Sequence, residues 1–359
     1  MIRRVLFLGS PKQNAPWIDY CINHQIPFIS IYLDEPPSRS NFPKRLQQEY
    51  PGERIAEHAS YKLPLDTDLE KIVHFLSLKQ FVPTFIVCAS EIPLYIDLEE
   101  ELNQWYDTET RSCARALSFY RTKSAQDRIC NELGIPTIPK QGEHGLCVKR
   151  DAKNFSTSQD VPKYRWEPSD YQPIDGEYVQ AWIDQDYHLG LRLYADHLGN
   201  WHLLLAAKFW YVKGVQSHLT EPYNLSAWES ESVLSRLRQL CNSITIRNRF
   251  MHMEIVKPRD HQILYHMDFN NRHGGILQSH RGDRQILSID YPTILLSSTP
   301  PEQRQTVFRT RHCRLFFYDH HHRFTKEQIR RIRFYEDPGL VLRNDYVNCD
   351  KITILRRDT

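Results

Sequence analysis

Residues 250–270, FMHMEIVKPRDHQILYHMDFN, contain two stretches in which apolar and polar residues alternate. The stretches 250–257 and 261–270 are separated by Pro-Arg-Asp, a combination that favours a turn, so they predict an antiparallel β-hairpin. In both stretches the apolar side chains occupy the odd positions. Because side chains alternate between the two faces of a strand, we expect both odd faces to pack on a core.

The even positions of this hairpin carry the side chains that could do chemistry: His252, Glu254, His266, Asp268 and Asn270. If the apolar faces coincide, Glu254, Asp268 and Asn270 meet on the opposite face. Two carboxylates at a few ångströms raise each other's pKa, and magnesium bound with nucleotide phosphates removes that conflict. A solvated hairpin face is the alternative for the acids alone. Arg272 and two glycines follow directly, however, and a guanidinium there can bind phosphate or carboxylate oxygens.

The first 108 residues alternate buried-strand patterns, RRVLFLG, PFISIYL and PTFIVCAS, with segments compatible with helices. This alternation is typical of a parallel sheet, so we predict a doubly wound N-terminal α/β domain over 1–108. Gly9 opens a strand-to-helix turn, but GSPKQN matches neither a dinucleotide-binding nor a Walker-type phosphate loop.

Beyond this unit, the segment beginning at Thr122, TKSAQDRICNELGIPTIPK, predicts a capped amphipathic helix that ends at Gly134. A strand with Lys149 (GLCVKR) follows, and the polar, proline-containing stretch 151–176 predicts an exposed loop. Strand patterns then dominate, with one further helix predicted at 227–241. The chain as a whole is predicted to be α/β (α+β).

Composition narrows the class of protein. A length of 359 residues favours two or three domains. The net charge of +2 argues against a nucleic-acid partner, and no stretch approaches the roughly 20 apolar residues of a membrane helix. The lack of such an apolar stretch favours a protein without a membrane association. The eight cysteines are scattered without a CxxC pair, which favours reduced thiols and a cytoplasmic protein.

At this point the sequence resembles the ATP-grasp superfamily of carboxylate–amine ligases. HMEIV and MDFNNRHGG look like the last motif of that family, in which an acid on one strand precedes an acid-x-Asn on the next, with an arginine close behind. The resemblance implies that Glu254 and Asp268 are metal carboxylates, that Asn270 is the third ligand, and that Arg272 is a catalytic residue. Aspartate stands at 268 where glutamate is commoner.

The upstream segments resemble the nucleotide-binding part of the same family. Lys123 takes the position of the first nucleotide-contacting lysine, and Lys149 that of the second, which is also expected to act in catalysis. EYVQAWIDQDYHLGL resembles the hinge strand, and the resemblance implies adenine-side and ribose-side residues: Gln180, Ala181 and Trp182, then Asp186. The family usually has glutamate in this hinge.

A second departure lies in the acidic strand, where His252 stands at a position that often carries arginine. Either Arg192 or Lys208 could supply the missing positive charge.

The resemblance implies a domain order. It places an ATP-grasp domain of two α+β subdomains at 109–300, with a lid subdomain at about 122–182, and leaves 301–359 as an extension packing on that domain.

It also implies a reaction with ATP and Mg²⁺, or Mn²⁺ in its place. A carboxylate becomes an acyl phosphate and is joined to an amine, each a small molecule such as an amino acid or a peptide. A homodimer is compatible with this. A phosphotransferase on the same scaffold and a nucleotide-binding protein without catalysis are the alternatives.

Overall fold

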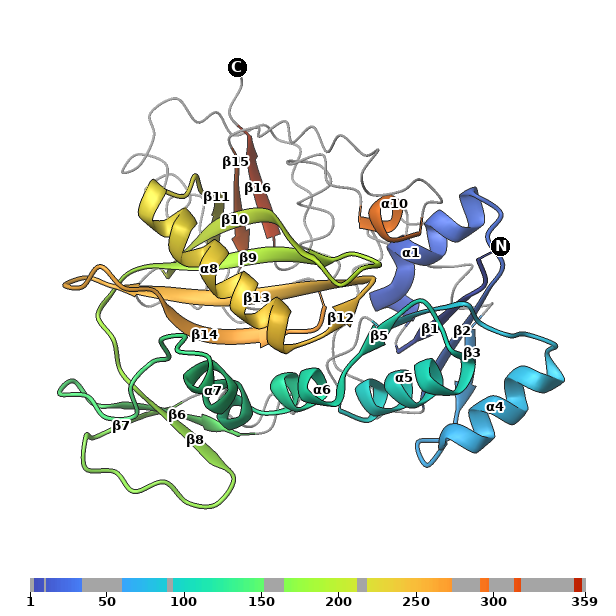
Figure 1. Cartoon of the computed structure of the whole chain (residues 1–359), viewed down its shortest axis with the longest axis horizontal. Helices are drawn as coiled ribbons and strands as arrows, with labels where there is room; N and C mark the ends of the chain where they lie inside the picture. Colours follow the sequence, from blue (N-terminus) through green and yellow to red (C-terminus); the bar gives the residue numbers. More distant parts are fainter. Residues whose placement is uncertain are drawn as a thin grey trace.

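The structure of the chain is a computed structural model, shown in Figure 1. It describes residues 3–9, 11–33, 60–88, 93–151, 165–211, 218–272, 291–296, 313–317 and 352–356. Much of the loop predicted at 151–176 and most of the C-terminal extension lie outside these ranges.

The N-terminal sheet consists of four parallel strands in the order β3-β2-β1-β4. The strands are β1 (Val5–Leu8), β2 (Phe28–Leu33), β3 (Ser60–Leu63) and β4 (Phe85–Cys88). The helices of this unit are α1 (Pro11–Asn23), α4 (Leu69–Leu78) and α5 (Pro93–Tyr106). Every residue of β1 and β4 is buried, as expected for parallel strands covered on both faces. The predicted N-terminal α/β unit is confirmed.

Two helices and a small sheet follow. The helices are α6 (Ala114–Arg121) and α7 (Lys123–Glu132), and the strands are β6 (Leu146–Arg150), β7 (Arg165–Glu167) and β8 (Glu177–Ala181), in the antiparallel order β7-β6-β8. The hydroxyl of Thr122 accepts a hydrogen bond from Ala125 N–H and so caps α7. Gly134 takes φ +69° just after the helix, a conformation that favours glycine. Both helix signals predicted from the sequence are confirmed.

A seven-stranded antiparallel sheet forms the centre of the molecule, in the order β14-β13-β9-β10-β11-β15-β16 (Figure 1). Its strands are β9 (Gln185–Ala195), β10 (Trp201–Tyr211), β11 (His218–Pro222), β13 (Arg249–Pro258), β14 (Tyr265–Asn270), β15 (Cys313–Phe317) and β16 (Ile352–Arg356). Helix α8 (Ala227–Ser243) lies across one face and packs Val233, Leu237 and Leu240 into the main core. The same core takes Phe119 of α6 and Ile129 of α7, so these helices pack against the same face of the sheet as α8. The other face of β13 lies toward β8, where Ala181 packs against Val256.

Smaller elements join the two large units. Strand β5 (Arg111–Ser112) pairs with β12 (Ile246–Arg247), and α10 (Tyr291–Leu296) packs beside α1 on the N-terminal unit. The domain boundaries given above stay predictions. No helix within the described ranges is both long enough and apolar enough to span a membrane.

Strands β13 and β14 pair as the alternation predicts over the half that carries the acids. Glu254 lies opposite Asp268, and His252 lies opposite Asn270. Met253 pairs with Phe269, which lies between Asp268 and Asn270 on β14. Both of these apolar side chains are fully buried on the core face. The prediction that the two acids share one face is therefore confirmed.

The other half of the hairpin differs from the prediction because the register shifts between Glu254 and Ile255. This bulge skips one residue of β14, so His266 lies opposite Ile255. His266 is consequently buried beside α6 and α7 and leaves the acidic face. Tyr265 and Met267, predicted to join the main core, pack instead in a small apolar cluster with Val256 on the face of the acids.

Candidate functional site

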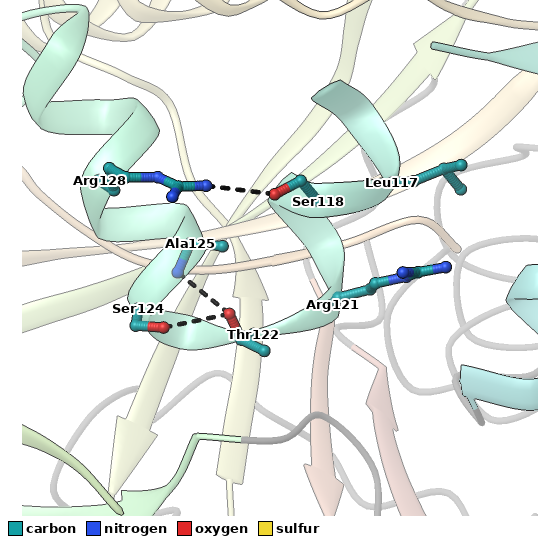
Figure 2. Close-up of a pocket in the computed structure, with 7 residues that line it drawn as sticks. All are labelled: Leu117, Ser118, Arg121, Thr122, Ser124, Ala125 and Arg128. Atoms are coloured by element: carbon teal, nitrogen blue, oxygen red, sulfur yellow. Dashed lines mark hydrogen bonds between the residues drawn. The ribbon is translucent and has the colours of Figure 1, made fainter. Parts of the chain in front are cut away.

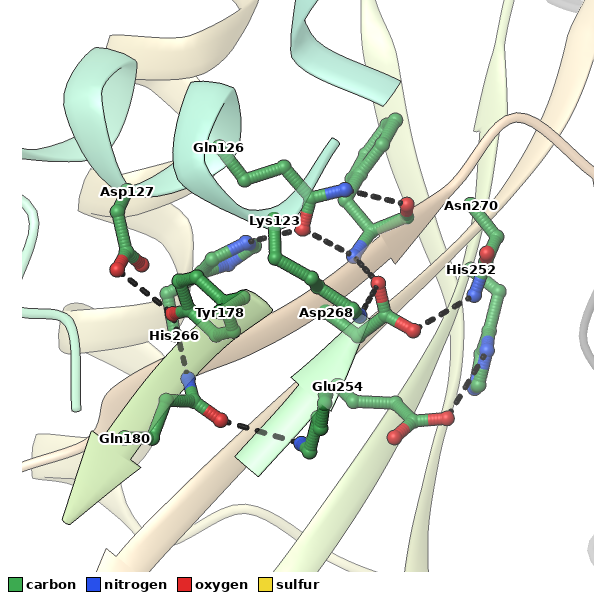
Figure 3. A network of polar contacts seen from close by, with 12 residues as sticks. Lys123, Gln126, Asp127, Tyr178, Gln180, His252, Glu254, His266, Asp268 and Asn270 are labelled. Atoms are coloured by element: carbon green, nitrogen blue, oxygen red, sulfur yellow. Dashed lines mark hydrogen bonds and ion pairs between the residues drawn. The ribbon is translucent and has the colours of Figure 1, made fainter. Parts of the chain in front are cut away.

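Glu254 is surrounded by two histidines. His188 Nε2 lies 3.2 Å from Glu254 Oε2. His252 Nδ1 lies 3.7 Å from Glu254 Oε1, as Figure 3 shows. Burial acts to raise the pKa of Glu254, but its contact with His188 outweighs this and lowers the pKa below its ordinary value. Glu254 is therefore an ionised carboxylate, as a metal ligand must be.

His252 is neutral in this setting. Burial lowers its pKa to about 3, and the nearby positive charge of Arg192 acts in the same direction. Arg192 lies directly opposite His252 on β9 and is itself buried. Of the two cations that could supply the missing charge, Arg192 is thus the one beside the acids. Lys208 instead lies over the rings of Tyr187 and Tyr223, 4.9 and 5.7 Å from their centres.

Asp268 forms an ion pair with Lys123, the first residue of α7. Two further contacts come from its own strand: Phe269 N–H donates to Oδ1 at 2.8 Å, and Asn270 Nδ2 donates to Oδ2 at 3.4 Å. Figure 3 shows the Lys123 side chain reaching down from α7 to this carboxylate. The structure thus brings together Glu254, Asp268, Asn270 and the first predicted lysine.

The donor set suits a hard cation. Carboxylate and amide oxygens are the ligands that magnesium and manganese accept in proteins. Within the described ranges, no group of three or more His, Cys, Asp and Glu side chains is arranged to hold a metal ion. The pair of acids at β13 and β14 is a partial donor set of the kind that nucleotide phosphates complete.

Gln126 holds α7 against β14. Its Nε2 donates to the carbonyl oxygen of Phe269 at 2.9 Å, and its Oε1 accepts from Phe269 N–H at 3.1 Å. The Gln126 side chain is buried. At this edge of the sheet it makes the backbone hydrogen bonds to β14 that a neighbouring strand would otherwise make. Gln126 lies one helical turn after Lys123. Its two hydrogen bonds to Phe269 therefore fix the position along β14 at which Lys123 meets Asp268.

Lys149 approaches the same cluster from β6. Its Nζ donates to Gln180 Oε1 on β8 at 3.1 Å. Burial lowers the pKa of Lys149, and the positive charge of Lys123 lowers it further, while Asp268 and Glu254 act in the opposite direction. Lys149 therefore lies within electrostatic reach of both predicted acids, and Lys123 pairs directly with Asp268.

The backbone N–H groups of the hinge residues Ala181 and Trp182 bind the segment between α7 and β6. Ala181 N–H donates to Pro139 O at 2.6 Å, and Trp182 N–H donates to Gly145 O at 2.8 Å. Ala181 is buried with Ile138 and Val256, whereas the side chain of Trp182 is 46% exposed. The predicted adenine strand thus forms one wall of a small apolar cluster on the face of the acids.

Asp186 has a different neighbour. Its Oδ2 lies 2.9 Å from Lys257 Nζ, and its side chain is 47% exposed. Its assignment to ribose stays a prediction. His188, two residues further along β9, is the residue of this segment that contacts Glu254.

Arg272 follows β14 at the junction with the N-terminal unit. A cavity of about 30 Å³ there is lined by residues of both units: Trp17, Ile86, Val87, Cys88, Glu99, Thr110, Asn248, Arg249, Phe250, Asn271, Arg272 and Leu295. Arg249 and Glu99 form a bidentate buried ion pair across this junction, with both distances at 2.8 Å. The charge of Arg272 also lowers the pKa of His252, so this guanidinium lies near the acidic cluster.

A larger hollow of about 560 Å³ lies between α6 and α7 (Figure 2). It is lined by Leu117, Ser118, Arg121, Thr122, Ser124, Ala125 and Arg128. The cations at this hollow already have partners, since Arg121 pairs with Asp97 and Arg128 donates to Ser118 at 3.4 Å. None of the predicted acids or lysines lines it, so the larger hollow is not the candidate nucleotide site.

Sequence reasoning missed four side chains of the cluster: His188, Gln126, Tyr178 and Asp127. Gln126 and Asp127 belong to a helix whose polar positions suggest a solvated face. His188 and Tyr178 lie in strands where a single polar residue is an ordinary occurrence. Their burial, at 4% exposure or less, is what distinguishes them.

No protein-family model matches the chain, and a comparison with curated proteins finds no relative. Solved structures do resemble it. L-amino acid ligase from Bacillus licheniformis aligns with 88% of this chain and 79% of its own, at 14% identity and a TM-score of 0.63. N5-carboxyaminoimidazole synthase from Aspergillus clavatus, in complex with ADP and 5-aminoimidazole ribonucleotide, aligns with 88% and 81%, at 11% identity and a TM-score of 0.60.

Biotin carboxylase from Campylobacter jejuni, as a βγ-ATP complex, aligns with 87% of this chain and 75% of its own, at 12% identity and a TM-score of 0.58. These alignments span both the N-terminal parallel sheet and the large antiparallel sheet. At such low identity they establish the architecture alone. The chain has the ATP-grasp fold.

Proposed function

We propose that this chain is an ATP- and Mg²⁺-dependent ligase that joins a carboxylate to an amine. The observation that carries the proposal is the convergence of two opposed acids, Glu254 and Asp268, with the ammonium groups of Lys123 and Lys149. Phosphoryl transfer from ATP is catalysed mainly by such placement of charge. The ATP-grasp fold and the names of its structural neighbours support the same reading.

Glu254, Asp268 and Asn270 would hold Mg²⁺, with Mn²⁺ as a substitute of similar ligand preference. When bound, the metal supplies positive charge beside the nucleotide phosphates. Lys123 would exchange its contact with Asp268 for phosphate oxygens, and Lys149 would bind them from the lid. The adenine base would lie against Ala181 near Gln180 and Trp182, with Asp186 on the ribose side.

The reaction proceeds in two displacements. A substrate carboxylate oxygen attacks the γ-phosphorus of ATP, and the bond from this phosphorus to the β–γ bridging oxygen breaks. ADP leaves, and the carboxylate has become an acyl phosphate. The amine then attacks the acyl carbon, loses a proton, and expels phosphate to give the amide. Arg272 would stabilise charge on the acyl phosphate.

The substrates we propose are small molecules, such as amino acids or a peptide. The described cysteines are free thiols, which agrees with a reducing cytoplasm. The charge balance offers no support for a nucleic-acid substrate.

The test is ADP release by the purified protein with pairs of amino acids and short peptides, with the products identified by mass spectrometry. We expect ADP, phosphate and an amide in equal amounts for a productive pair, and no turnover in Glu254→Ala or Lys149→Ala. Turnover that survives both substitutions unchanged would refute the site assignment.

Two outcomes would favour other functions on the same fold. A stable phosphorylated product without phosphate release indicates a phosphotransferase. Saturable ATP binding without turnover across the substrate panel indicates a nucleotide-binding protein that is not an enzyme.

A further inference from the structure

A continuous chain of hydrogen bonds leads from α7 to the ammonium group of Lys149. Tyr178 donates to Asp127 Oδ2 at 2.6 Å, Gln180 Nε2 donates to the Tyr178 oxygen at 2.8 Å, and Lys149 donates to Gln180 Oε1 at 3.1 Å. Asp127, Tyr178 and Gln180 are each at most 4% exposed. Figure 3 shows the hydrogen bonds that lead from Asp127 through Tyr178 to Gln180.

The direction of every bond in this chain follows from one charge. An ionised carboxylate can only accept hydrogen bonds, so the Tyr178 hydroxyl must donate its single hydrogen to Asp127. The Tyr178 oxygen can then only accept, and it takes a hydrogen from the amide nitrogen of Gln180. The amide oxygen of Gln180 is thereby turned toward Lys149, which has only donors to offer.

The opposite orientation of the Gln180 amide would be unfavourable at both ends. It would place the NH₂ group against the ammonium of Lys149 and leave the amide oxygen facing the Tyr178 oxygen. Because the site is buried, such unmatched groups are strongly disfavoured. Lys140 lies 3.8 Å from Asp127 Oδ2 and 5.0 Å from the centre of the Tyr178 ring, so a cation supports the charge at the start of the chain.

We propose that Asp127 and Tyr178 are positioning residues that act through Gln180 to place Lys149 for the phosphates of ATP. This inference rests on the proposed function for the role of Lys149. Neither Asp127 nor Tyr178 has to touch the nucleotide. Gln180, predicted to stand on the adenine side, gains a second assignment: its neutral amide holds Lys149 without cancelling the charge that the phosphates need.

The experiment compares four proteins: wild type, Tyr178→Phe, the double variant Tyr178→Phe/Gln180→Glu, and Tyr171→Phe. In Tyr178→Phe the Gln180 amide is free to turn, and we expect KM for ATP to rise about three- to tenfold, the worth of one hydrogen bond. In the double variant both carboxylate oxygens accept, so Lys149 is held again without an orienting partner, and we expect its ammonium to regain the wild-type protection from acylation that the second measurement follows.

Tyr171→Phe is the matched control. Tyr171 also donates to a carboxylate, Glu177 Oε2, at 2.7 Å in the same region, but it is not on the path to Lys149. We expect its KM to stay at the wild-type value. A general loosening of the lid would raise KM in both single variants, and this pattern would overturn the proposal.

A second measurement does not depend on turnover. The rate at which an acylating reagent modifies Lys149, followed by mass spectrometry without ATP, should rise in Tyr178→Phe and fall again in the double variant. If wild type neither binds nor hydrolyses ATP, the proposed function fails and the labelling alone decides whether Lys149 is held by this chain. Equal labelling in all four proteins, or an unchanged KM in Tyr178→Phe, contradicts the inference.

Discussion

Lys123 and Asp268 form an ion pair that joins the first residue of α7 to the acidic end of β14. The contact places an ammonium group where the proposed function requires a divalent cation. Binding of Mg²⁺ and ATP would therefore exchange partners within the site: Asp268 would pass from Lys123 to the metal, and Lys123 from Asp268 to phosphate. The two predictions that follow test each side of this exchange.

Asp268→Asn should abolish turnover and greatly weaken the dependence on Mg²⁺. The substitution keeps the size of the side chain but removes one of the two carboxylates. Loss of outer contacts around metal sites commonly costs 10- to 100-fold, so loss of a direct ligand should reduce ADP release by more than about 100-fold. Asp184→Asn is the control, because Asp184 forms an exposed ion pair with Arg259. Comparable activity loss in both variants would argue against a metal role for Asp268.

Lys123→Met should weaken ATP binding while leaving the fold intact. Hydrogen bonds to charged groups contribute about 1.5–3 kcal/mol, which corresponds to a roughly 10- to 150-fold rise in the dissociation constant for ATP. Calorimetric titration would measure it. Lys71→Met provides the comparison, since Lys71 pairs with Asp66 at an exposed position of the N-terminal unit. Unchanged affinity in Lys123→Met would place Lys123 outside the phosphate site.

Stability should fall at acid pH through Glu229, near the start of α8. Burial acts to raise the pKa of this carboxyl, but hydrogen bonds from Ser226, Tyr187 and Tyr223 outweigh it and lower the pKa below 4.5. Between the lowered pKa and 4.5 the unfolded chain binds more protons, so the free energy of unfolding decreases as pH falls through that window.

Glu229→Gln should lower the free energy of unfolding at pH 7 by about 1–3 kcal/mol, because hydrogen bonds to a charged acceptor are lost. Its stability should also respond less to acidification below pH 4.5 than that of wild type. Urea unfolding at several pH values would measure both effects. Glu231→Gln, at an exposed position of the same helix, should match wild type; equal behaviour of the two variants would contradict this account.

Gly142→Ala should disturb the hinge. A Cβ added at Gly142 would lie 2.7 Å from the Cβ of Ala181, too close for either backbone to remain in place. The segment that bonds the Ala181 and Trp182 N–H groups would shift, and we expect ATP affinity to fall about three- to tenfold, the worth of one hydrogen bond.

The double variant Gly142→Ala/Ala181→Gly removes the atom that causes the collision and should recover most of the affinity. Calorimetric titration with ATP would compare the single and double variants. A double variant no better than Gly142→Ala would show that the collision is not the cause.

The acidic site was predictable because alternation is a local property of a strand. The positions of Met253 and Phe269 fix which face is buried, and Glu254 and Asp268 must then share the other face. The bulge after Glu254 was not predictable, since no glycine or proline marks it and the pattern continues unchanged through it. That single skipped residue moved His266 to the core side.

The positions of Gln126, Asp127 and Tyr178 depend on contacts distant in sequence. In isolation, a glutamine and an aspartate on a helix suggest a surface face. Their burial results from docking α7 against β14 and β8, where Gln126 bonds the backbone of Phe269 and Asp127 accepts from Tyr178. Sequence patterns predict which strands and helices form, whereas these polar pairings follow only from the packing of one on another.

The central claim is that Glu254 and Asp268 form a magnesium site for ATP. Its most direct measurement is calorimetric titration of ATP into wild type and Glu254→Ala, each with Mg²⁺ and with EDTA. We predict saturable binding to wild type that requires Mg²⁺ and is lost in Glu254→Ala. Binding of ATP that is equally strong in EDTA or in the variant, or no binding to wild type with Mg²⁺, would contradict the account.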